Sequence, residues 1–238
     1  MIASLPDKPE IFMSDLQIVS ATVCPYAQRT RMVLLEKKID FEVVEIDLKN
    51  KPDWFAGVSP YGKVPVLRHM GKTIYESAVI NEYLDETFPA HPLMPTQPDQ
   101  RALARIWIEY CNSKLCPLFY KTLLAQDEGV QSELVEKFKG ILSFMELEGF
   151  AKLQGVGPFW MGSSPNLVDF TFYPFFERFC VLDHYRGLSI PEDCKRLRDW
   201  IGTISKHPCA METANTQEFH INNYQSYSVA SASVEFRS

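Results

Sequence analysis

Ten residues near the middle of the chain, 89–98, carry four prolines and separate two different patterns of apolar residues. Proline has a fixed φ and no backbone N–H, so this density excludes a helix or a central strand. Short apolar runs with the spacing of strands precede the segment, and longer runs with helical spacing follow it. This change of apolar spacing predicts a small α/β domain joined by an extended linker to an all-helical domain.

The predicted elements of the first part follow the order β-α-β, an irregular segment, and β-β-α. This order implies a parallel strand pair with a crossover helix, followed by an antiparallel hairpin that turns at His69-Met70-Gly71. We expect strands at 16–23, 41–48, 64–67 and 72–75, and helices at 25–38 and 76–88.

After the linker the apolar spacing is helical. A capping residue, Asn166, stands three positions ahead of Asp169 and predicts a helix start. The polar tail from Glu218 to Ser238 is expected to be partly mobile. We expect helices at 99–124 with a kink near Pro117, at 131–153, from 166 to 184, and at 193–206.

These patterns set the predicted domain limits. The first domain is expected to span residues 1–88, with an ordered core from about residue 15, and the linker to span 89–98. The all-helical domain with its polar tail is then expected to span 99–238.

Charge and hydropathy exclude several classes of partner. The 238 residues include 24 Lys and Arg against 30 Asp and Glu, a net charge of −6, and the basic residues are scattered. A protein that binds the phosphate backbone of a nucleic acid is therefore not expected. The longest charge-free stretches, 154–168 and 219–234, are rich in Gly, Pro, Ser or Asn, so no membrane span is expected. Residues 1–10 lack the apolar region of a secretory signal, which predicts a cytoplasmic protein.

The six cysteines and five histidines are loosely spaced. Without an export signal we interpret the cysteines as thiols in a reducing compartment. Cys111 and Cys116 fall on helix faces that should be buried, where burial raises a thiol pKa. There is no C-x-x-C and no paired histidine motif, so no metal site is expected.

The sharpest local feature is Cys24-Pro25-Tyr26-Ala27, where the first predicted strand gives way to the first helix. Pro25 suits the first helical position, which leaves Cys24 at or beside the N-cap. The helix N-terminus favours a thiolate, and Arg29 and Arg31 lie within the next two turns. We therefore expect a lowered Cys24 pKa.

A lowered pKa suits thiol exchange mainly because it makes the sulfur a better leaving group. Ala27 stands where a dithiol oxidoreductase carries its second cysteine, so an external thiol must resolve any mixed disulfide at Cys24. A lone cysteine before a helix can also be a small buried apolar residue. The strand and Cys-Pro context favours the reactive interpretation.

Two dipeptides further along the chain each leave two interpretations open. Val64-Pro65 precedes a short strand, and from the dipeptide alone a trans bond is expected. In the cis form Val64 would offer a backbone edge to a short peptide. Glu76-Ser77 stands at the start of a predicted helix. It is either a simple cap or a binding site, in which the Ser77 hydroxyl and the free N–H groups bind a carboxylate and Glu76 binds an ammonium group.

Four N-terminal segments together resemble the cytosolic glutathione transferases in order and spacing: residues 24–29 (CPYAQR), 48–55 (LKNKPDWF), 62–67 (GKVPVL) and 75–80 (YESAVI). They look most like the omega class, which carries a cysteine where most classes have tyrosine or serine. Residues 166–169 and 173–178 resemble the core helix of the family's helical domain, with Asn166 where many relatives have serine or threonine. The segment from Gln217 onward departs from the family's closing helix.

This resemblance implies a thioredoxin-like N-terminal domain with a cis Val64–Pro65 bond, and an all-helical C-terminal domain. Cys24 would form a mixed disulfide with glutathione. Lys51 would meet the glycyl carboxylate, and Val64 would pair its backbone with the cysteinyl unit. Glu76 and Ser77 would hold the γ-glutamyl end.

The resemblance also implies a homodimer with an apolar cleft for a second substrate between the domains. Tyr26, Trp107 and Tyr110 are candidates for its lining, although Trp107 and Tyr110 at helical spacing suit a core equally. No metal is implied. Glutathione and a small disulfide or electrophile are the expected ligands.

The leading functional hypothesis is a glutathione-dependent thiol transferase that removes glutathione from mixed disulfides and reduces disulfides or dehydroascorbate. Conjugation to electrophiles should be weak, because a site cysteine bonds to the glutathione sulfur instead of stabilising its thiolate. One alternative is a binding module of the same fold with vestigial activity. Another is a relative of the intracellular chloride-channel proteins, which share the Cys-Pro helix start, although no apolar span near Cys24 supports it.

Overall fold

The computed structural model describes residues 15–153 and 155–229, and in this part of the chain the strands form a single four-stranded sheet. The strand order is β2-β1-β3-β4. β2 runs parallel to β1, while β3 and β4 add antiparallel pairs, as the predicted β-α-β and β-β-α order requires. The strands are β1 (Leu16–Ser20), β2 (Glu42–Glu45), β3 (Val66–His69) and β4 (Lys72–Tyr75).

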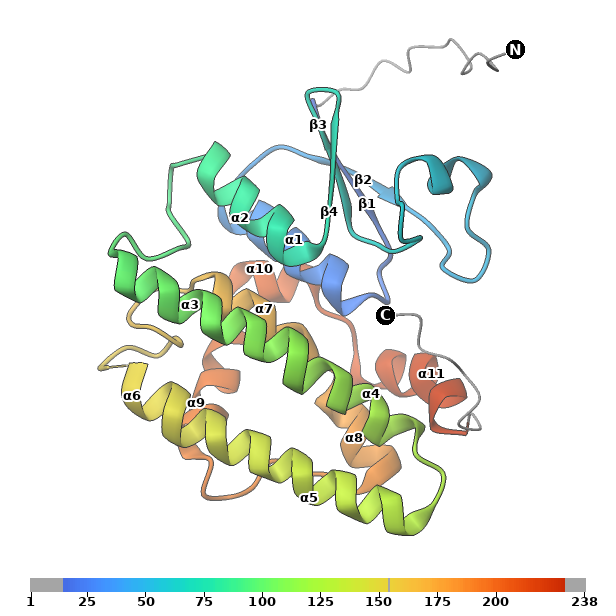
Figure 1. Ribbon diagram of the computed structural model, residues 1–238, viewed down its shortest axis with the longest axis vertical. Coiled ribbons are helices and arrows are strands. Elements are labelled where there is room, and N and C mark those ends of the chain that lie inside the picture. Colours follow the sequence, from blue (N-terminus) through green and yellow to red (C-terminus); the bar gives the residue numbers. More distant parts are fainter. Residues whose placement is uncertain (1–14, 154, 230–238) are drawn as a thin grey trace.

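Two helices cover the face of the sheet that is turned toward the rest of the protein (Figure 1). These are α1 (Pro25–Glu36) and α2 (Ser77–Thr87), and the 3₁₀ turn η1 (Asp53–Gly57) follows β2. β1 is fully buried because it is central and covered on both faces, whereas β2 and β4 at the edges are largely exposed. α1 packs against α2 on one side and against α7 and α10 on the other.

The remaining described chain is helical. π-helical turns η2 (Cys111–Leu115) and η3 (Met145–Phe150) interrupt two of its long helices, and η2 lies where the kink near Pro117 was predicted. The helices are α3 (Pro98–Tyr110), α4 (Cys116–Leu124), α5 (Glu128–Phe144), α6 (Ala151–Leu153), α7 (Leu167–Glu177), α8 (Phe179–Arg186), α9 (Lys195–Ile204), α10 (Pro208–Thr213) and α11 (Gln217–Ser228).

α7 forms the centre of the helical part and is almost entirely buried. Its apolar residues point in every direction, as expected for a helix that is surrounded by others. The predicted start at Asn166 is confirmed, because Asn166 and Asp169 form a reciprocal capping box. The predicted continuous helix from 166 to 184 is interrupted, since α7 ends at Glu177 and α8 begins at Phe179.

The tail from Glu218 onward, which is predicted to be partly mobile, begins in a helix that the sequence patterns did not indicate. Residues 217–228 form α11, which packs against α8 and α4 (Figure 1). Thr216 caps its start by accepting a hydrogen bond from the Phe219 N–H. The rest of the predicted tail, from residue 230, and the expected extension before residue 15 lie outside the described residues.

The predicted class, an α/β domain followed by an all-α domain, is confirmed. α2 ends at Thr87 and α3 begins at Pro98, while the limits assigned to the domains stay a prediction. Among the described helices, none combines the length and apolar character that a membrane crossing requires.

Candidate active site

Cys24 is the N-cap residue of α1, and a short turn, residues 21–23, separates it from the end of β1. Its extended backbone (φ −87°, ψ 119°) turns the chain into the helix, and Pro25 occupies the first helical turn. Cys24 is 9% exposed and packs in a small apolar cluster with Val19 of β1 and Val66 of β3. Its Sγ lies 3.8 Å from the carbonyl oxygen of Val64, which stands two residues before β3.

The expected low pKa of Cys24 is wrong for the free protein. Burial raises the pKa above the ordinary value of 9.0, although the backbone N–H groups of Ala27 and Tyr26 and the charges of Arg178 and Arg29 act in the opposite direction. The helix N-terminus, Arg29 and Arg31 are neighbours of Cys24 in the sequence. Loss of solvent around the sulfur depends on the tertiary fold, and here its effect is larger.

This pKa has a measurable consequence. At pH 7 Cys24 should be predominantly the neutral thiol, and its alkylation rate should keep rising beyond pH 9. Iodoacetamide modification across a pH series, followed on the Cys24 peptide by mass spectrometry with free glutathione as reference, measures this. A rate that reaches a plateau below pH 8 would show instead that the helix terminus outweighs burial.

A cavity of about 850 Å³ lies beside Cys24. The first domain contributes Tyr26, Val64, Pro65, Glu76 and Ser77 to its wall. The structure thus brings together five of the residues that the sequence singled out, from α1, the start of β3 and the start of α2. Cys24 itself lies behind this wall, in contact with Val64.

The Val64–Pro65 bond is cis, as the resemblance implied. Glu76, the N-cap of α2, has a positive φ of 71°. This conformation costs a non-glycine residue roughly 1–3 kcal/mol and is typical of functional sites. Ser77 follows as the first residue of α2, and its hydroxyl accepts a hydrogen bond from Arg29 Nη1 at 3.4 Å.

Lys51 is not part of the cavity wall. It is exposed, and its Nζ donates a hydrogen bond to the Gly62 carbonyl at 2.7 Å. On the side of the first domain, the cavity is lined instead by Lys63, which was not among the candidate site residues. The loop between η1 and β3 holds Lys63, since the Ser59 hydroxyl accepts from the Lys63 N–H and donates to its carbonyl, both at 2.8 Å.

Two of the three aromatic residues proposed for the cleft lie elsewhere. Trp107 is 6% exposed and packs against Trp160 in the helical core, with ring centroids 5.2 Å apart. Tyr110 stacks on Phe144, away from the cavity. Helical spacing identifies an apolar face but does not show whether that face meets a core or a cleft, so both interpretations were open for these two residues.

The helical wall of the cavity comes from the end of α3, from η2 and α4, and from α11. Glu109, Asn112, Tyr120, Lys121 and Tyr227 line it, so the wall is aromatic and polar instead of purely apolar. Sequence reasoning missed this set. The predicted break near Pro117 was the one available signal for the residues of η2 and α4, because π-helical turns often occur at functional sites.

A buried polar network joins the start of α1 to the junction of α7 and α8. Arg178, at the junction of α7 and α8, donates hydrogen bonds to the Val23 carbonyl at 3.4 Å and to the Gln28 side chain. Gln28 donates in turn to Glu177 at 2.7 Å, and His220 of α11 lies 2.8 Å from the same carboxylate. The network thus connects Val23, just before Cys24, and Gln28, in the first part of α1, to the helical domain.

Arg29 forms a second connection. It is 1% exposed, and its Nε donates to the Thr171 carbonyl of α7 at 2.8 Å. Its Nη2 lies 3.3 Å from the sulfurs of both Cys111 and Cys116. Burial raises the pKa of Cys111 as expected. The expectation for Cys116 is wrong, because burial acts to raise its pKa but the Cys111 thiol and Arg29 together lower it.

Comparison with known proteins places this geometry in a family. Residues 23–87 match the family model described as glutathione S-transferase, N-terminal domain, and residues 128–202 match the one described as glutathione S-transferase, C-terminal domain. The chain is 35% identical over 194 residues to glutathione S-transferase omega-1 of Sus scrofa, covering 81% of this chain and 78% of that protein.

Two further comparisons agree. The chain is 31% identical over 198 residues to the probable cytosolic glutathione S-transferase DHAR1 of Oryza sativa, covering 82% of this chain and 85% of the relative. Its structure superposes on the crystal structure of glutathione transferase Omega 3C from Trametes versicolor with a TM-score of 0.80 at 27% identity, covering 90% of each chain.

Proposed function

This chain belongs to the glutathione S-transferase family, and from that membership we propose that it is a glutathione-dependent thiol transferase acting through a mixed disulfide at Cys24. The observation that carries the proposal is the position of Cys24 at the start of α1, in contact with Val64 of the cavity wall. Ala27 gives the motif no second thiol, so glutathione must complete each turnover.

The proposed reaction has two exchange steps. The Cys24 thiolate attacks the glutathionyl sulfur of a mixed disulfide, a Cys24–glutathione disulfide forms, and the released thiolate takes up a proton. A second glutathione thiolate then attacks the glutathionyl sulfur, glutathione disulfide leaves, and the Cys24 thiolate is restored. The substrates we propose are glutathionylated thiols, small disulfides and dehydroascorbate.

We propose that the cavity wall binds glutathione through the residues that the sequence singled out. The Val64 backbone, beside the Cys24 sulfur, would pair with the cysteinyl unit. Glu76 and Ser77, at the start of α2, would bind the ammonium and carboxylate of the γ-glutamyl end. Lys51 remains our proposal for the glycyl carboxylate, and Lys63 in the wall offers a second cation nearby.

We also propose that the protein works in the cytoplasm as a homodimer. The rice relative is named as cytosolic, and all six cysteines of this chain are free, which fits a reducing compartment. Sedimentation of the purified chain tests the dimer.

A glutathione adduct tests the proposed chemistry directly. After incubation with glutathione disulfide and removal of excess reagent, mass spectrometry should find one glutathionyl group per chain, on Cys24, that free glutathione removes. Cys180, a partly exposed thiol of α8, serves as the internal control and should stay unmodified. If Cys24 carries no adduct while Cys180 does, the mixed-disulfide mechanism is wrong and the binding-module alternative becomes the better hypothesis.

A further inference from the structure

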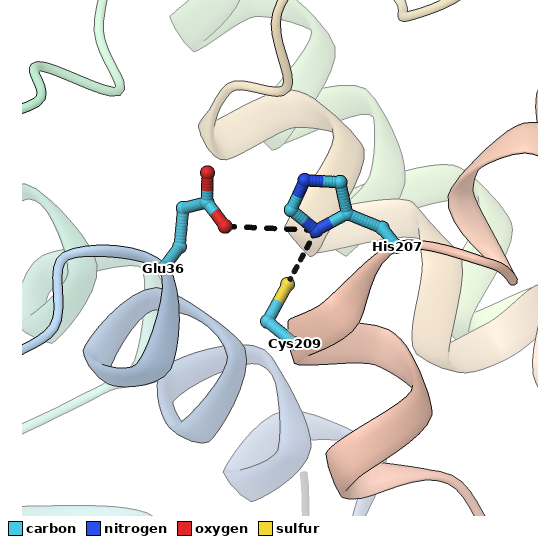
Figure 2. A group of neighbouring side chains, drawn as sticks. All are labelled: Glu36, His207 and Cys209. Carbon is cyan, nitrogen blue, oxygen red and sulfur yellow. Dashed lines mark hydrogen bonds and ion pairs between the residues drawn. The ribbon is translucent and has the colours of Figure 1, made fainter.

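Three side chains that are far apart in the sequence converge at the end of α1 opposite Cys24. Glu36 is the last residue of α1, and His207 and Cys209 stand at the start of α10 (Figure 2). α1 has 12 residues, so the group lies about 18 Å along the helix from the Cys24 turn. The proposed glutathione site does not use any of these residues.

The distances from His207 to the other two side chains suit a shared metal ion. His207 Nδ1 lies 3.2 Å from Cys209 Sγ and 3.5 Å from Glu36 Oε2, and the three atoms all lie within 4.8 Å of one another. Tetrahedral zinc has Zn–N, Zn–O and Zn–S bonds of about 2.0, 2.1 and 2.3 Å, which place the nitrogen about 3.5 Å from the sulfur and about 3.4 Å from the oxygen. The observed separations are close to both values.

Two of the interactions in this group compete for one nitrogen of His207. In Figure 2 both interactions end on the same ring nitrogen of His207. With a proton on that nitrogen, His207 can donate to Glu36 but cannot accept from the Cys209 thiol. Without the proton it can accept from the thiol, but its lone pair then also faces a carboxylate oxygen. A cation between the three atoms would be attracted by all of them.

The fold holds the donors in place. His207 is the extended N-cap of α10 and Pro208 is its first residue, so the backbone that carries both donors is constrained. The rings of Phe159 and Phe170 flank the imidazole, with centroids 5.9 and 6.5 Å away. Cys209 is 3% exposed, whereas the side chains of His207 and Glu36 are 18% and 24% exposed. Solvent therefore reaches one side of the group.

We propose that Glu36, His207 and Cys209 bind one zinc ion, with a water molecule as the fourth ligand. A thiolate, an imidazole and a carboxylate form a donor set that zinc accepts readily. Burial raises the pKa of the Cys209 thiol to about 12, so zinc must displace the thiol proton, which leaves to solvent. The bound ion would link the end of α1 to α10 and so connect the two parts of the fold.

Zinc binding is tested on the full chain, freed of metal by a chelator and titrated with zinc chloride. One ion should bind per chain, and Glu36→Ala, His207→Asn and Cys209→Ser should each lower the affinity by more than about 100-fold, since loss of an outer-shell partner alone costs 10–100-fold. The matched controls are Glu133→Ala, an exposed carboxylate on α5, and Cys180→Ser, and both should bind as the unchanged chain does.

Two further measurements keep the test independent of folding and of Cys24. Zinc at 100 times its Kd should raise Tm by about 5–10 °C, and Glu36→Ala, a substitution at a helix end, should remove that rise. Cobalt should give a thiolate charge-transfer band that Cys209→Ser abolishes and Cys24→Ser retains. Absence of one-to-one binding, or binding that Cys24→Ser abolishes and Glu36→Ala leaves intact, would overturn the proposal without affecting the proposed function.

Discussion

Cys24→Ala is expected to lower the rate of glutathione-dependent disulfide reduction by at least about 1000-fold, to the level of the uncatalysed reaction. Without the sulfur no mixed disulfide can form, and the first exchange step is lost entirely. Cys24→Ser should lose as much, because a serine hydroxyl is scarcely ionised at neutral pH and forms no disulfide. The measurement is the initial rate of reduction of a small disulfide by glutathione at pH 8.

Cys180→Ala is the matched control for this experiment and should keep the rate within about twofold. The Cys24 thiol is buried in an apolar cluster, so its removal should cost roughly 1 kcal/mol of stability, and thermal unfolding must confirm that the variant is folded. A folded Cys24→Ala variant with more than a tenth of the original rate would show that Cys24 is not the exchanging thiol.

The same variants separate thiol transfer from conjugation. Conjugation of glutathione to an aromatic electrophile should be slow in the unchanged chain and equally slow in Cys24→Ser. A strong conjugation activity in the unchanged chain would contradict this part of the proposal, because it requires a residue that stabilises the free glutathione thiolate. The polar residues of the helical wall, Glu109 and Lys121 among them, would then be the first to examine.

Local features of the sequence predicted the first domain well. The apolar run before Cys24 and the proline after it fix the end of β1 and the start of α1 within a few residues of each other. Both features act through neighbouring residues, which a sequence shows directly. The same is true of the capping box at Asn166 and Asp169, whose two hydrogen bonds close within one helical turn.

Features that depend on the tertiary fold were missed. α11 buries His220, Tyr224 and Ser228, which are not the apolar residues that reveal a helix by their spacing. The Cys24 pKa was predicted from the helix end alone, while the dominant influence is burial by the surrounding fold. Glu36 and His207 meet only because α10 packs against α1, and nothing in their sequence separation indicates it.

The largest loss of stability is expected for Asp169→Ala, at about 3–5 kcal/mol. Asp169 is fully buried, and its carboxylate accepts hydrogen bonds from the Trp160 N–H at 2.9 Å, the Trp200 indole at 2.7 Å and the Asn166 N–H at 2.8 Å. Alanine leaves three buried donors without an acceptor, and each such group costs about 1–3 kcal/mol before the structure relaxes. The loss of the capping box adds to this.

Urea unfolding at pH 8 measures the effect, since burial raises the Asp169 pKa to about 6 and the carboxylate is charged at that pH. Asp169→Asn should cost less than alanine, because its amide oxygen still accepts from the Trp200 indole. Asp99→Ala, in the exposed first turn of α3, is the control and should cost no more than about 0.5 kcal/mol. A loss below 1 kcal/mol in Asp169→Ala would mean that water replaces the carboxylate at the centre of the helical domain. α7 would then be held by its apolar packing alone, and the contacts of Arg29 and Arg178 that connect it to the Cys24 turn would not depend on this cap.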